Sequence, residues 1–229
     1  MYFKNNTIKY LIVASLFSCN LNSLDKEIER INEFENRDEF KKAILEIDKS
    51  LIKFPNNIEL LISKGVNLSA IKKYNEAILC YSKVIQIDSN NSMAYLNRGR
   101  NYNRISRNTK ALNDYDKIIK LKSVGVFYID LVENPYTQTN LSYEVNIVEV
   151  KHSRGIALYE MDSLKEAFKE FDFCIENKYE LSSSYYWRGL IYISYEMFKE
   201  GCLDINSALE NGNNYCQDIK EKYCQLRRL

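Results

Sequence analysis

Apolar residues recur along most of the chain at the spacing of an α-helix. Leu61, Gly65 and Leu68 stand at positions i, i+4 and i+7, and Ala77, Tyr81 and Val84 form a second series of the same kind. This spacing places the side chains of each series on one face of a helix. The 229 residues include only 7 Gly and 2 Pro, whereas a sheet protein needs turn residues every ~8–12 positions. The pattern therefore predicts an all-α fold.

The predicted helices recur in pairs with a period of 34 residues. Gly65 and Gly99 have this separation, and after an interruption Gly155 and Gly189 have it again. Glycine within a helix costs ~1 kcal/mol relative to alanine, so its recurrence indicates close helix approach. We expect recurring alanines to provide the facing small surface and recurring aromatic rings to fill the space between successive pairs. These two columns are Ala43, Ala77, Ala111 and Ala167, and Tyr81, Tyr115 and Phe171.

The period and the two columns resemble the tetratricopeptide repeat (TPR) family. The resemblance implies an α-solenoid of about five TPR helix-turn-helix repeats with a C-terminal capping helix. Repeats 1–3 occupy residues 24–125, an insertion occupies 126–147, repeats 4–5 occupy 148–215, and the capping helix occupies 216–229. Apolar spacing that resumes at Ser142 predicts that the fourth repeat's first helix extends backwards. The insertion is interpreted either as a tolerated surface segment or as one that redirects the solenoid or contacts a partner.

The first residues of the chain have the form of a secretory signal. Lys4 and Lys9 precede an apolar run over residues 11–17, and Ser18-Cys19 closes the run. The run is shorter than the ~20 residues that span a bilayer. Leu16-Phe17-Ser18-Cys19 resembles the lipobox of bacterial lipoproteins. That resemblance implies a signal peptide over residues 1–18, acylation of Cys19, a short tether over 19–23, and a location in the bacterial cell envelope, at the outer membrane facing the periplasm.

The balance of charge excludes one class of function. The chain has 32 Lys or Arg against 31 Asp or Glu, which does not fit a general nucleic-acid binder; we expect no nucleic-acid partner. Residues 92–125 nevertheless carry eight Lys or Arg against two Asp. This local excess is interpreted either as a solvated helix face or as a surface for an acidic partner or anionic lipid.

Residues suited to catalysis are few. His152 is the only histidine, and the chain has no HExxH motif, no CxxC pair and no glycine-rich phosphate loop. His152 is interpreted as a helix residue whose ring is satisfied by solvent or a neighbour. We therefore expect that the protein is not an enzyme and has no cofactor and no metal.

The TPR resemblance implies that the first helices of successive repeats line a concave groove. The off-seam positions of these helices are basic in the middle of the groove and apolar towards its C-terminal end. We predict that a peptide or protein segment with apolar anchors and an acid binds there. The predicted binding residues are Asn97, Arg100, Arg104, Ile156, Trp187 and Leu190.

Two cysteines near the C-terminus stand at comparable distances from a predicted turn over residues 211–214. Antiparallel helices joined by this turn would bring Cys202 and Cys224 to one level. Helix rotation decides whether their sulfurs meet, so the alternatives are a disulfide and two independent thiols. A resemblance to bacteroidete-type TPR lipoproteins favours the pair. Cys80 and Cys174 lie in apolar registers and are expected to be buried thiols.

These observations predict a lipid-anchored TPR adaptor that binds a protein in its groove. The alternative is a structural subunit of an outer-membrane assembly or secretion complex. The partner itself is not named by the sequence.

Overall fold

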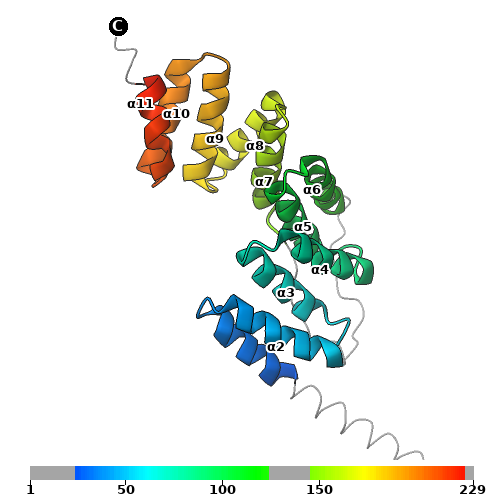
Figure 1. Cartoon of the computed structure of the whole chain (residues 1–229). Coiled ribbons are helices and arrows are strands. Elements are labelled where there is room, and N and C mark those ends of the chain that lie inside the picture. Colours follow the sequence, from blue (N-terminus) through cyan, green and yellow to red (C-terminus); the bar gives the residue numbers. More distant parts are fainter. Residues whose placement is uncertain (1–23, 124–144, 225–229) are drawn as a thin grey trace, which may run out of the picture. The chain divides into compact units, whose positions relative to one another are not determined.

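The computed structural model describes residues 24–123 and 145–224 (Figure 1). The regular elements within these two ranges are all helices, and none of them has the length and hydrophobicity needed to span a membrane. The predicted all-α fold of TPR-like helix pairs with a C-terminal helix is confirmed. A helix over residues 24–35 is followed by α2 (Phe40–Lys53), α3 (Ile58–Ala70), α4 (Tyr74–Ile87), α5 (Ser92–Arg104), α6 (Asn108–Ser123), α7 (Ile147–Glu160), α8 (Leu164–Glu176), α9 (Leu181–Ser194), α10 (Phe198–Glu210), the 3₁₀ turn η1 (Asn214–Cys216) and α11 (Gln217–Cys224).

The chain divides into two compact units between Ser89 and Asn90. The N-terminal unit contains the helix over residues 24–35 and α2 to α4, and the C-terminal unit contains α5 to α11. Within each unit, helices that follow one another in sequence pack together: α3 against α2 and α4, and α7 against α6 and α8. The division falls where the sequence places the end of the second repeat.

The repeat also fixes where helices begin and where the chain turns. Asn57, Asn91 and Asn146 each accept a backbone N–H with the side chain, at 2.9 Å, and so cap α3, α5 and α7. Each turn inside a pair contains one non-glycine residue with a positive φ, which reverses the chain after the last helical turn. These residues are Asp38, Lys72, Ser106, Asp162 and Glu196.

The glycine column marks close contact within a repeat. A Cβ added at Gly65 would lie 2.6 Å from the Tyr81 ring, and one at Gly99 would lie 2.6 Å from the Tyr115 ring. Both rings are buried. The prediction of close helix approach is therefore confirmed. The rings also reach the following repeat, as predicted, since Phe171 stacks on Trp187 of α9. Each ring covers the glycine of its own repeat, because the second helix turns back antiparallel onto the first.

The first and last repeats use different side chains for the same contact. The first repeat has Ile31 at the glycine position and Ile47 at the aromatic position, and both are buried in one cluster. The last repeat keeps Gly189, places Ile205 at the aromatic position, and has Gly201 at the alanine position. In the first repeat a smaller side chain on the second helix thus accompanies the larger one on the first, and the space stays filled as a close-packed core requires. In the last repeat Ile193 packs against Gly201 instead.

The first helix of the fourth repeat begins at the start of that repeat, without the predicted backward extension. α7 starts at Ile147, and Asn146 caps it with a side-chain hydrogen bond to Val148 N. Residues 145 and 146 are not helical, so the backward extension of this helix from Ser142 is wrong. Asn146 sets the N-terminus of α7, because its side chain accepts a backbone N–H that would otherwise need a carbonyl from a preceding helical turn. The predicted insertion over residues 126–147 otherwise lies outside the described residues.

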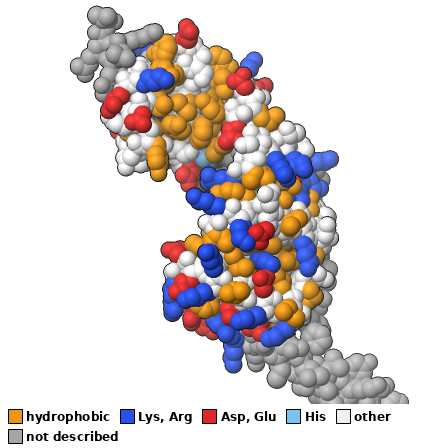
Figure 2. Space-filling view, viewed as in Figure 1, with side chains coloured by type: hydrophobic (Ala, Val, Ile, Leu, Met, Phe, Trp, Pro, Cys, Tyr) orange, Lys and Arg blue, Asp and Glu red, His pale blue; other side chains and the backbone are white. Residues whose placement is uncertain are grey.

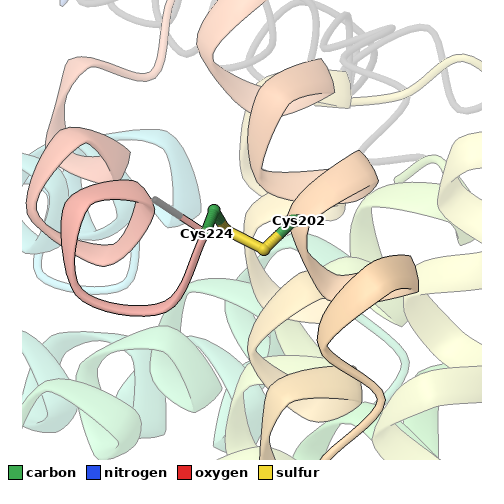
Figure 3. Close-up of a disulfide and its surroundings, with 2 residues drawn as sticks. All are labelled: Cys202 and Cys224. Carbon is green, nitrogen blue, oxygen red and sulfur yellow. A yellow bond between two sulfur atoms is a disulfide. The ribbon is translucent and has the colours of Figure 1, made fainter. Parts of the chain in front are cut away.

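The C-terminal helix is joined to the last repeat by a disulfide. Cys202 on α10 and Cys224 at the end of α11 are bonded, with 5.6 Å between their Cα atoms (Figure 3). Between them, Cys216 is a buried free thiol that packs with Ile205 and Ala208. None of the side chains of α11 is itself fully buried. The covalent link is therefore a principal attachment of this helix.

Candidate partner-binding surface

The C-terminal unit presents the first helices of three pairs, α5, α7 and α9. α5 contacts α7 directly, and α8 packs between α7 and α9. The tight glycine contacts at Gly99, Gly155 and Gly189 hold each of these helices against its own partner helix. The six residues predicted to bind a partner all lie on these helices. α5 carries Asn97, Arg100 and Arg104, α7 carries Ile156, and α9 carries Trp187 and Leu190.

The apolar part of this surface is an aromatic cluster around Trp187. The Trp187 ring stacks on the buried Phe171 ring, with centroids 6.2 Å apart, and lies 4.9 Å from the ring of Tyr159. Ile156 packs against the same core cluster. Trp187 and Leu190 are half-buried, and orange side chains gather over α9 and α10 in Figure 2. The ring of Trp187 is thus held by the core on one side and partly accessible to solvent.

The basic part of the surface already contains an acid. Arg100 forms a 2.8 Å ion pair with Glu149 of α7, and its Nε donates to Ser153 Oγ at 3.2 Å. Arg104 lies one turn further along α5 and is exposed. An acidic group of a partner would therefore reach Arg104 directly, but would compete with Glu149 at Arg100. This intramolecular pair is the main difference from the site that the sequence predicts.

His152 is enclosed next to this basic part. Its Nε2 lies 3.1 Å from Ser183 Oγ, and its ring makes edge contacts with Phe171 and Tyr179, at 5.9 and 5.8 Å between centroids. Burial, with a smaller contribution from the charge of Arg100, lowers the pKa of His152 to about 4. The ring is therefore neutral at pH 7. This agrees with its interpretation as a helix residue satisfied by a neighbour.

Sequence reasoning missed a series of ion pairs that crosses each helix pair of the C-terminal unit. Arg98 donates to Asp114 at 2.7 and 2.9 Å, and Arg188 donates to Asp204 at the same separation of 16 residues. Arg154 pairs with Glu170 in the equivalent position. The hydrogen bond to Asp204 raises the pKa of Arg188, against burial, which would lower it. These largely buried cations stay charged and tie the two helices of each repeat together.

The signal for these pairs was present in the sequence. A basic residue stands directly before each glycine of the repeat column. In three of the repeats an acid stands directly before the residue of the aromatic column. The second repeat departs from this rule, because Cys80 replaces the acid. Lys64 pairs there with Asp48 of the preceding repeat, at 2.6 Å. Arg188 makes both kinds of contact, since it also reaches Asp172 of the repeat before.

The N-terminal unit is polar at the position equivalent to Trp187, although Val66, which corresponds to Arg100 and Leu190, is 47% exposed. Ser63, which corresponds to Asn97 and Trp187, donates to Glu35 at 2.6 Å. Asn67 is buried and donates to the same carboxylate. The two units therefore present different chemistry at the same repeat position.

Metal chemistry finds no support among the described residues, which contain no cluster of three or more His, Cys, Asp or Glu side chains that could hold an ion. Cys19, the predicted acylation site, lies outside the described residues.

Comparison with solved structures identifies a shared fold. No family model matches the chain, and no curated protein matches it. A MamA protein of known crystal structure is 21% identical to this chain in sequence, with a TM-score of 0.62; the match covers 87% of this chain and 94% of that chain. PilW, described as a widely conserved type IV pilus biogenesis factor, is 11% identical, with a TM-score of 0.66, over 89% and 92%. PilF of Pseudomonas aeruginosa is 15% identical, with a TM-score of 0.62, over 82% and 76%. These likenesses show a TPR-like fold.

Proposed function

We propose that this protein is a lipid-anchored interaction adaptor of the bacterial cell envelope, at the outer membrane facing the periplasm, and that it has no enzymatic activity. The observation that carries the proposal is the aromatic cluster around Trp187, which is supported from below by Phe171 and remains partly accessible. Tryptophan and arginine are the residue types that most often dominate interface energies. The lipobox-like sequence at Cys19 supports the anchor.

The ligand is a peptide or protein segment with apolar anchors and an acid. Its anchors lie on Trp187, Leu190 and Ile156, and its acid lies at Arg104, within reach of Arg100. Asn97 adds a polar contact on the same helix. Arg100 is paired with Glu149, so an acid of the ligand gains one ion pair there only by breaking another. This exchange contributes to specificity more than to affinity.

The first experiment tests the binding surface. Once a partner has been isolated by co-purification from the native envelope, Trp187→Ala should weaken binding about tenfold or more, as expected for a hot spot. Leu190→Ser is the second variant, because Trp187 also packs on the core. Tyr195→Ala is the matched control, since Tyr195 is an exposed aromatic residue at the end of the same helix. Equal affinities for all three variants would refute the proposed surface.

The second experiment tests the anchor. Metabolic labelling with a fatty-acid analogue should mark the wild-type protein and not Cys19→Ala. Label on the substituted protein would exclude Cys19 as the acylation site.

A second function is favoured by one of the structural likenesses. PilW is described as a pilus biogenesis factor, and by analogy this chain would be a structural subunit of an outer-membrane assembly or secretion complex. A stoichiometric membrane complex that survives purification would support this alternative, whereas a transient, salt-sensitive partner would support the adaptor.

A further inference from the structure

The N-terminal unit exposes large aliphatic side chains on its second helices. On α2, Leu45 is 62% exposed and Ile52 is 83% exposed. They are seven residues apart and therefore lie on the same helix face. Leu79 on α4 occupies the position of Leu45 in the next repeat and is 70% exposed. Three solvated aliphatic side chains thus belong to one outward surface of this unit.

The same positions are polar or charged in most of the C-terminal unit. The exposed residues that correspond to Leu45 and Leu79 are Asn113 and Lys169, and only Leu203 in the last repeat is apolar. Because the fold is the same in all these repeats, the repeat geometry does not require an aliphatic side chain at this position. The exposed leucines of the N-terminal unit are therefore not a consequence of the repeat fold, and they occur there in consecutive repeats.

Lysines surround the aliphatic face of α2. This helix has four lysines and two acids, and Lys41, Lys42 and Lys49 lie within about one turn of Leu45. Asp48 lies on the same face and is paired with Lys64 of α3 at 2.6 Å. Lys42 pairs with Glu39 at 2.9 Å, and Lys49 pairs with Glu46 at 2.6 Å. Both lysines are exposed in these pairs, and exposed pairs of this kind contribute little free energy. The ammonium groups can exchange these carboxylates for other anions. Blue and orange side chains intermingle in the part of Figure 2 where Figure 1 draws α2.

The position of the predicted anchor decides what this face meets. Residue 24, where the described helix begins, is five positions after Cys19. Five residues span at most ~17 Å when fully extended. If Cys19 carries the acyl chains, the start of the first repeat at Leu24 is held within this distance of the bilayer surface.

We propose that the outward face of α2, extended by Leu79 of α4, lies on a membrane surface that contains anionic phospholipid. This inference rests on the lipid anchor of the proposed function. Leu45 and Ile52 enter the interface between headgroups and acyl chains, and the flanking lysines contact lipid phosphates. A basic rim around aliphatic side chains fits an anionic lipid surface better than a protein interface, where lysine is depleted. The contact fixes the orientation of the N-terminal unit on the membrane.

Tryptophan fluorescence in vesicles tests this contact. The full-length acylated protein has a single tryptophan, Trp187, whose signal is subtracted with the unsubstituted protein. Leu45→Trp is reconstituted into vesicles of phosphatidylcholine and phosphatidylglycerol with brominated acyl chains. The matched control is Asn113→Trp, which places the ring at the equivalent exposed position of the C-terminal unit. Because bromine quenches only nearby rings, we expect about half of the Leu45→Trp emission to be lost, and little of the Asn113→Trp emission.

The outcomes separate this inference from the anchor itself. If the protein floats with the vesicles but Leu45→Trp is not quenched, the anchor stands and the membrane contact is refuted. That result would assign the face to a protein partner instead. If the protein does not float, the anchor of the proposed function has failed. Leu45→Glu with Ile52→Glu gives a second readout, because the pair should abolish the protection of α2 amides by vesicles without changing the circular dichroism spectrum.

Discussion

The two units differ in which helices of the repeat carry most of their exposed apolar side chains. In the N-terminal unit the first helices carry hydrogen bonds between Ser63, Asn67 and Glu35, and most of the exposed apolar side chains lie on the second helices, α2 and α4. In the C-terminal unit the first helices present Trp187 and its aromatic neighbours, and the outer positions are mostly polar. The core columns leave these surface positions free to differ. One fold can therefore contain two separate contact surfaces without a change in its packing.

The largest expected effect concerns the column that both units share. Gly99→Leu should lower the free energy of unfolding by ~3 kcal/mol or more, because the buried Tyr115 ring leaves no space for the added atoms. Gly65→Leu should have a similar effect through Tyr81. Hydrogen exchange should show that loss of protection starts in the unit that carries the substitution. Asn36→Leu, at an exposed position, should change stability by less than ~0.5 kcal/mol. Equal losses for Asn36→Leu and Gly99→Leu would mean that the repeat register is wrong.

The second prediction uses a group that only the C-terminal unit has. The folded-state pKa of His152 is lowered to about 4 from an ordinary value of 6.5. As the pH falls, His152 therefore binds a proton in the unfolded chain before it does so in the folded protein. Stability is therefore fully present above pH 6.5 and declines towards pH 4, by ~3 kcal/mol in total. The charge of Arg100 contributes to this cost.

Chemical denaturation of wild-type protein and His152→Phe across this range measures the effect. The free energy of unfolding of the wild-type protein minus that of His152→Phe should decline as the pH falls. Carboxylates are common to both proteins, so their titration cancels in this difference. Amide protection in α7 to α9 should decrease in this window, whereas protection in α3 and α4 should not. A parallel pH response of the two proteins would show that His152 is not enclosed as described.

The smallest effect tests the turns inside the helix pairs. Lys72 in the N-terminal unit has φ = 62° and Ser106 in the C-terminal unit has φ = 55°. Glycine adopts this conformation without the steric cost of a Cβ, so either residue replaced by glycine should raise stability by ~0.5–1 kcal/mol. Lys73→Gly is the matched control, because φ at Lys73 is −85°. It should be neutral or destabilising, and thermal unfolding would show the difference in sign.

The sequence allowed the fold to be predicted because its signals are periodic. Gly65 and Gly99 recur at a fixed offset, and a costly glycine within a helix indicates a close contact that a side chain would block. The candidate site was less accessible. The partner of Arg100 is Glu149, which is 49 positions away across the insertion, and no local spacing connects them. The start of α7 depended on a single capping side chain, Asn146, which apolar spacing does not reveal. The pairs of Arg98 and Arg188 were periodic and could have been found.

The contacts between repeats also bear on how the chain accommodates extra length. Arg188 reaches Asp172 of the preceding repeat over 16 residues, and Arg154 reaches Asp116 over 38. The difference is 22 residues, which is the length of the predicted insertion. On the two sides of that segment, Lys122 donates to the carbonyl of Val145. The alignment of α7 on α6 therefore follows the ordinary repeat contacts despite the extra residues between them. This junction is a natural grafting point, where we expect a foreign segment to replace the native one while the neighbouring helices keep their alignment.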